Sequence, residues 1–114
     1  MAIAKKALVW SLFAAGGTLT AILFPALIAL FLLVSLGFLP VGLGYPEMSR
    51  FTSSWTGKLI LFGILFFSLW HAAHRMRVIF HDLGIRADAA IALGLYFVAA
   101  LGTVMAVFYL WPVQ

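Results

Sequence analysis

Residues 59–84 read LILFGILFFSLWHAAHRMRVIFHDLG. The first part of this stretch, as far as Trp70, carries no charge. The second part holds all three histidines of the chain, two arginines and an aspartate. An apolar run that passes directly into titratable residues is typical of a helix that reaches a membrane surface. The stretch therefore predicts a membrane helix with a polar end.

The rest of the chain is as apolar as this stretch. Of 114 residues, 66% are hydrophobic and 9% are charged, whereas soluble domains have about 25% charged residues. Three stretches are uncharged: between Lys6 and Glu47, between Lys58 and Arg75, and from Ala89 onward. Because a helix needs about 20 apolar residues to cross a bilayer, each stretch supplies one crossing. We predict an all-α integral membrane protein with three transmembrane helices and a single domain, residues 1–114.

Breaker and capping residues predict the helix ends. The expected helices span about residues 8–36, 55–83 and 88–111, with a loop at GFLPVGLGYP, residues 37–46. Ser53 or Ser54 is a candidate cap for the second helix, and Gly84 is its expected stop. Asp88 is the expected cap of the third helix.

A row of mostly small residues follows one side of the third helix. Ala90, Gly94, Val98, Gly102 and Ala106 are spaced by four. Small residues let two membrane helices approach closely, so this row predicts a helix–helix contact.

The basic residues predict the orientation. Seven Lys and Arg against three Asp and Glu give a net charge of +4, and they cluster at helix ends, which indicates topology rather than nucleic-acid binding. One side of the membrane would carry Lys5, Lys6, Arg75, Arg77 and Arg86, and the other Arg50 and Lys58. The positive-inside rule then places the N-terminus in the cytoplasm. The apolar run after Lys6 is longer than that of a signal peptide, so we expect a retained helix.

The polar end of the second helix is the first candidate site. His71, His74, Arg75 and Asp82 lie on one face, because residues three and four apart are neighbours on a helix. Ionisable groups at membrane depth usually face a bundle interior and indicate function. Arginines beyond a helix end more often anchor it at the surface, and we assign only that role to Arg77 and Arg86; for His74 and Arg75 both interpretations stay open.

Trp10 is the second candidate. It begins the first helix, on the same side as Arg75, where an interfacial tryptophan is ordinarily an aromatic-belt residue. An indole N–H and a guanidinium facing one cavity would supply donors and no acceptor. Such a pair suits an apolar ligand with carbonyl oxygens, for example a quinone.

Two segments resemble a known family. LVWSLFAAGGTLTAILFPALI (8–28) and LWHAAHRMRVIFHDLGI (69–85) are similar to the D-type subunit of fumarate reductase, the smaller hydrophobic membrane anchor of quinol:fumarate reductase. The similarity includes the tryptophan before LF-x-AGG, the proline within the first helix, and H-R-M followed by H-D-L. The three-helix plan agrees over the whole chain.

The resemblance implies a non-catalytic subunit of an oxidoreductase in the bacterial inner membrane. It implies that this chain forms a helical bundle with a second hydrophobic anchor, the C-type subunit. The two anchors together would hold an iron–sulfur subunit and a flavoprotein subunit on the cytoplasmic face of the membrane. Flavin and iron–sulfur clusters would lie only in those partners, and no metal site is expected in this chain. Menaquinol would be oxidised in a shared cavity lined by Trp10 and Arg75. From the residues, His74 is a third candidate for quinone binding. Either His74 or a carboxylate of a partner would accept the proton, and the resemblance points to the partner.

Two positions depart from the family pattern. His71 stands where cysteine is expected, and His71 to Asp82 has the spacing of a haem-ligand histidine and an aspartate in related succinate dehydrogenase anchors. Because fumarate reductases with both anchor types are typically haem-free, we expect no haem b. The resemblance also links the polar patch before the second helix, matched by Phe51, Ser53 and Ser54, with quinone function. Serine replaces an expected glutamine there, and the order of the segments puts this patch on the opposite side of the membrane from Trp10 and Arg75.

Three other functions remain as alternatives. The chain could be a purely structural anchor without quinone contacts, or a succinate dehydrogenase anchor that holds haem b through His71. A small multidrug transporter has similar length and hydrophobicity, but its plan has four helices and a glutamate in the first. Here no carboxylate lies between Lys6 and Glu47, which disfavours transport.

Overall fold

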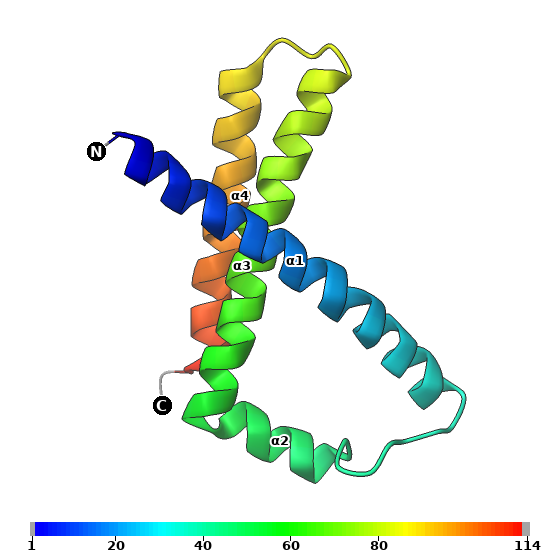
Figure 1. Cartoon of the computed structure of the whole chain (residues 1–114). Coiled ribbons are helices and arrows are strands. Elements are labelled where there is room, and N and C mark those ends of the chain that lie inside the picture. Colours follow the sequence, from blue (N-terminus) through cyan, green and yellow to red (C-terminus); the bar gives the residue numbers. More distant parts are fainter. Residues whose placement is uncertain (1, 113–114) are drawn as a thin grey trace.

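The chain folds into four α-helices. The computed structural model describes residues 2–112, with α1 (Ala2–Ser35), α2 (Tyr45–Ser53), α3 (Trp55–Asp82) and α4 (Asp88–Leu110) (Figure 1). Over these residues the secondary structure is helical with connecting turns, and no strand is present. Residues Ala4–Ser35 of α1, together with α3 and α4, are long and apolar enough to cross a membrane. The predicted all-α fold with three membrane-spanning helices is confirmed.

The short helix α2 was not predicted. Pro46 was interpreted as a loop residue, yet it lies in the first turn of α2, next to the acidic Glu47. Proline is favoured there, because the first N–H groups of a helix have no intrahelical partner, and a carboxylate stabilises the same end. Extended backbone at Ser54 separates α2 from α3, so the two helices meet at an angle (Figure 1).

The ends of α3 agree with the expected capping residues. The Ser54 hydroxyl accepts a hydrogen bond of 3.0 Å from the Gly57 N–H. At the other end Gly84 has φ +86°, and the Ile85 N–H donates to the Phe80 carbonyl at 3.1 Å, which is the pattern of a Schellman cap. The cap and the stop are therefore confirmed.

Asp88 does not cap α4, which corrects that prediction. Ala87 occupies the cap position without a side-chain hydrogen bond, and Asp88 is the first residue of the helix. The reason is that its carboxylate binds the Arg77 side chain of α3.

Small residues allow α3 and α4 to pack as an antiparallel hairpin (Figure 1). Ala73, Ala99 and Ala106 are buried. A Cβ atom on Gly102 would lie 3.1 Å from Leu69 Cδ1, so the two backbones are close, as small residues permit in membranes.

Only part of the predicted small-residue row lies in this contact. Gly102 and Ala106 face α3, whereas Ala90, Gly94 and Val98 are exposed. A spacing of four residues advances the side chain by more than one full turn of 3.6 residues, so the row drifts around α4 and away from α3.

The helix α1 crosses α3 at two adjacent glycines. A Cβ atom on Gly16 would lie 2.8 Å from the Phe67 carbonyl oxygen, and one on Gly17 would lie 2.7 Å from His71 Cε1. Beyond this crossing the C-terminal half of α1 diverges from the hairpin (Figure 1). On the N-terminal side of the crossing, α1 passes over the α3–α4 hairpin (Figure 1). A cavity lies between this part of α1 and the hairpin.

Candidate functional site

The cavity has a volume of about 610 Å³ and a mainly aromatic wall. Its rings are Trp10 and Phe13 of α1, Phe66, Phe67, Trp70, His71 and His74 of α3, and Tyr96 of α4. Lys5 and Lys6 supply the formal charges among its lining residues. Sites for small organic ligands commonly have volumes of about 300–1,000 Å³, apolar walls and a few polar groups, so the cavity suits a flat apolar molecule with polar edges.

His71 packs against α1. Its ring stacks on Phe13 with 4.6 Å between centroids and an interplanar angle of 24°. Its Nδ1 lies 3.3 Å from the Phe13 carbonyl oxygen, and its Cε1 side faces Gly17. The imidazole therefore fills the space that the glycine leaves and joins α1 to α3.

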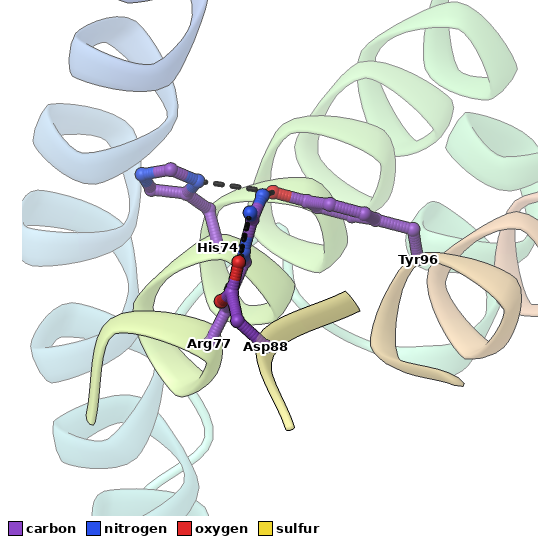
Figure 2. A network of polar contacts seen from close by, with 4 residues as sticks. All are labelled: His74, Arg77, Asp88 and Tyr96. Atoms are coloured by element: carbon purple, nitrogen blue, oxygen red, sulfur yellow. Dashed lines mark hydrogen bonds and ion pairs between the residues drawn. The ribbon is translucent and has the colours of Figure 1, made fainter. Parts of the chain in front are cut away.

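His74 lies one turn further along α3, between the cavity and α4. Its ring meets the edge of Phe13 at 4.7 Å. Its Nδ1 is 3.1 Å from the Tyr96 hydroxyl. The same hydroxyl accepts a hydrogen bond of 3.5 Å from Arg77 Nη1 (Figure 2). His74 is thus both a cavity residue and a member of a polar network.

Arg77 anchors that network to the start of α4. Its Nε and Nη2 donate to the two carboxylate oxygens of Asp88 at 2.9 Å and 2.6 Å (Figure 2). We assigned Arg77 only a surface-anchoring role, and that prediction is wrong, because the paired geometry uses the guanidinium to join α3 and α4. The sequence contains a signal for this pair, because an arginine and an aspartate on the two sides of a short turn between helices are placed to form an ion pair.

Of the candidate quinone-binding residues, Trp10 and His74 line the cavity together. The Trp10 indole is exposed and lies 5.5 Å from the Phe13 ring. Arg75 is exposed and is not among the lining residues, so this chain alone does not bring it to Trp10. Tyr96, Lys5 and Lys6 also line the cavity, although the sequence patterns did not predict them as site residues.

The residues of the polar patch lie elsewhere. Phe51 and Ser53 belong to α2, and Ser54 precedes α3. They are therefore at the end of α3 opposite to His71 and His74, as predicted from the order of the segments.

The geometry of His71 does not favour haem ligation. Nδ1 of His71 is in contact with the Phe13 carbonyl oxygen, so only Nε2 could bind a haem iron. A Cβ atom on Gly17 would be 3.4 Å from this Nε2, which therefore lies close to the backbone of α1. An axial ligand needs open space for the macrocycle at its free nitrogen. The packed imidazole agrees better with a helix-joining role, and an optical difference spectrum of the purified complex tests for haem b.

Comparison with known proteins gives one family. The sequence model of the D-type subunit of fumarate reductase matches residues 2–111. The chain is 36% identical over 106 residues to this fumarate reductase subunit from Aliivibrio fischeri, which covers 91% of this chain and 88% of that protein. It is 37% identical over 83 residues to the one from Haemophilus ducreyi, covering 72% and 69%. It is 34% identical over 106 residues to that from Vibrio cholerae, covering 91% and 82%.

Proposed function

Since this chain belongs to the family of the D-type subunit of fumarate reductase, and is thereby a membrane anchor of a fumarate reductase, we propose that it helps form the menaquinol-binding site of its complex. We propose the C-type anchor, the iron–sulfur subunit and the flavoprotein subunit as its partners. The chemistry on fumarate would belong to the flavoprotein, and this chain would contribute no catalytic residue.

One observation carries the proposal. Trp10 and His74, two of the candidate quinone-binding residues from the sequence, line the same aromatic cavity. Its volume of about 610 Å³ lies within the range for small-ligand sites. Aromatic side chains offer offset-stacked or edge contacts to a flat ring, and Trp10 can donate its N–H to a ligand oxygen.

Menaquinol, when bound, would supply two electrons and two protons. The residues of this chain would hold and orient the head group. The lining residues include no carboxylate, so the proton acceptor would be either His74 or a carboxylate of a partner protein. We propose the partner, as the family resemblance implies. Arg75, which is exposed on this chain, would contribute from the part of the shared site that a partner completes.

The position of the cavity supports the inner-membrane orientation. Lys5 and Lys6 line it, and Arg75, Arg77 and Arg86 lie at the same end of the helices, near the α3–α4 turn. We propose that this end faces the cytoplasm, where an iron–sulfur subunit would receive the electrons. Attachment to the C-type anchor would use the apolar surfaces that remain exposed, such as Ile22, Ile28 and Phe31 of α1.

The test separates quinol oxidation from fumarate reduction. In the assembled complex, Arg75→Leu and His74→Gln should strongly reduce menaquinol oxidation, while fumarate reduction with an artificial electron donor continues. Arg86→Leu, at an exposed arginine outside the cavity, is the matched control. Normal quinol kinetics in Trp10→Phe, His74→Gln and Arg75→Leu complexes would instead support a purely structural anchor.

A further inference from the structure

The hydroxyl of Tyr96 lies between two side chains of α3 (Figure 2). It is 3.1 Å from His74 Nδ1 and 3.5 Å from Arg77 Nη1. Asp88 in turn holds Arg77 through two hydrogen bonds. Because His74 and Tyr96 both line the cavity, these four side chains form a continuous polar chain from the α3–α4 turn to the cavity wall.

The direction of these hydrogen bonds follows from the groups involved. A guanidinium has donors and no acceptor, so Arg77 donates to Asp88 and to Tyr96. The tyrosine oxygen therefore accepts on one side, and its single hydrogen is available for another partner. Within the described residues, His74 Nδ1 is the other side-chain atom in hydrogen-bonding contact with this hydroxyl.

We infer that the chain from Asp88 through Arg77 and Tyr96 holds His74 as the neutral tautomer with its hydrogen on Nε2. A neutral imidazole has one donor nitrogen and one acceptor nitrogen, and which is which depends on the bond that the other nitrogen makes. When Tyr96 donates to Nδ1, the hydrogen is on Nε2. Figure 2 shows this second nitrogen turned away from Tyr96 and toward α1, the opposite wall of the cavity.

This tautomer makes His74 a hydrogen-bond donor toward the cavity. A donor at this position selects a ligand with an acceptor oxygen, such as a ring carbonyl. For the ligand, the inference rests on the proposed function: His74 binds an oxygen of the quinone and is not the base that takes a proton from the quinol. Tyr96, Arg77 and Asp88 are then positioning residues, which act on the ligand through His74.

The tautomer is measurable without any ligand. Nitrogen-15 NMR of the histidine-labelled complex in lipid distinguishes a protonated from an unprotonated ring nitrogen, and a His74→Gln complex assigns the His74 signals. We expect an unprotonated Nδ1 and a protonated Nε2 at neutral pH. A hydrogen on Nδ1, or an imidazolium, would overturn the inference.

Two variants test the origin of the tautomer. Tyr96→Phe keeps the ring and removes the hydroxyl, so the preference of His74 should change to a mixture of tautomers. Asp88→Asn removes the carboxylate that holds Arg77 but leaves the Tyr96 hydroxyl in place. It should therefore change the tautomer preference of His74 in the same direction but by less. Tyr109→Phe, at an exposed tyrosine of α4, is the control and should leave the His74 signals in place. An unchanged His74 spectrum in Tyr96→Phe would also overturn the inference.

Ligand binding separates this inference from the proposed function. Menaquinone binding to the complex should weaken roughly twofold to tenfold in Tyr96→Phe, which corresponds to the net effect of one hydrogen bond. If the tautomer is as expected but neither Tyr96→Phe nor His74→Gln changes menaquinone binding, the tautomer inference stands and the quinone assignment fails. If His74→Gln abolishes binding while His74 carries its hydrogen on Nδ1, the quinone assignment stands and the tautomer inference fails.

Discussion

The His71 ring and Gly17 are in direct contact where α1 crosses α3. A Cβ atom on Gly17 would lie 2.7 Å from His71 Cε1, and the imidazole also stacks on Phe13 at 4.6 Å. The absence of a side chain on one helix thus makes room for the ring of the other. This contact sets how the N-terminal half of α1 lies over the hairpin, and the cavity depends on it.

Adding a methyl group at the crossing should destabilise the protein, more at Gly16 than at Gly17. The Gly16 Cβ would meet a backbone oxygen of Phe67, whereas the Gly17 Cβ would meet the movable ring of His71. Overpacking of this kind costs about 1–3 kcal/mol. The measurement is the free energy of unfolding in mixed micelles. Gly63→Ala is the control, because its Cβ would have nothing within 4 Å.

The same crossing allows a test by second-site substitution. His71→Ala removes the ring that the Gly17 Cβ would contact, but it leaves the Phe67 carbonyl beside Gly16. We therefore expect His71→Ala to suppress much of the added cost of Gly17→Ala and little of that of Gly16→Ala. Equal coupling in the two double-mutant cycles would contradict this packing.

Replacement of Gly84 by alanine should destabilise the α3–α4 turn. Gly84 has φ +86°, a left-handed conformation that costs residues with a Cβ about 1–2 kcal/mol. The measured quantity is again the free energy of unfolding. Gly84→Asn should be the milder change, since asparagine tolerates this conformation better; an equal loss in both would point to a cause other than backbone conformation.

The Arg77–Asp88 pair should depend on complementary charge. Both side chains are partly exposed, at 34% and 42%, so the pair is sensitive to salt. We expect Arg77→Asp and Asp88→Arg each to lower the melting temperature and the double exchange to restore part of the loss. Additive losses in the double variant, at low and high salt alike, would show that the pair does not stabilise the hairpin.

The Trp10 indole should matter for menaquinol and not for the chemistry on fumarate. Trp10→Phe keeps an aromatic ring and removes the N–H donor. The KM for menaquinol should rise roughly twofold to tenfold, the range for one hydrogen bond, with activity from an artificial donor unchanged. Trp55→Phe is a matched control, because Trp55 begins α3 at the far end from the cavity and packs on Trp111.

Local sequence was sufficient for much of the fold. The membrane-crossing parts of α1, α3 and α4 follow from uncharged stretches of membrane length, and the Ser54 cap and Gly84 stop follow from local backbone chemistry. The start of α1 does not, because the helix begins at Ala2 and includes Lys5 and Lys6, whereas the uncharged stretch predicted a start near residue 8. Helix α2 was missed because Pro46 has two opposite meanings, breaker inside a helix and favoured residue in its first turn. Which of the two roles Pro46 has depends on whether the residues after it form a helix.

The site was predictable only in part. His74 is predicted as an ionisable group near membrane depth, and Trp10 as an N–H donor on the same side of the membrane; both line the cavity. Tyr96 and Asp88 were not selected, since a tyrosine within an apolar helix and an aspartate at a helix start have ordinary local roles. Their importance comes from contacts with α3, which helical periodicity within one segment does not contain.

By itself, the sequence determined which segments are membrane helices, where most of them end, and to which end the titratable groups belong. These are properties of neighbouring residues, because hydrophobicity, capping and turn geometry act over a few positions. The tertiary structure decided that His71 joins α1 to α3, that Arg77 pairs with Asp88, and that Tyr96 reaches His74. Such pairings depend on the angle at which helices cross and on the space left by glycines, and both arise only when separate segments pack together.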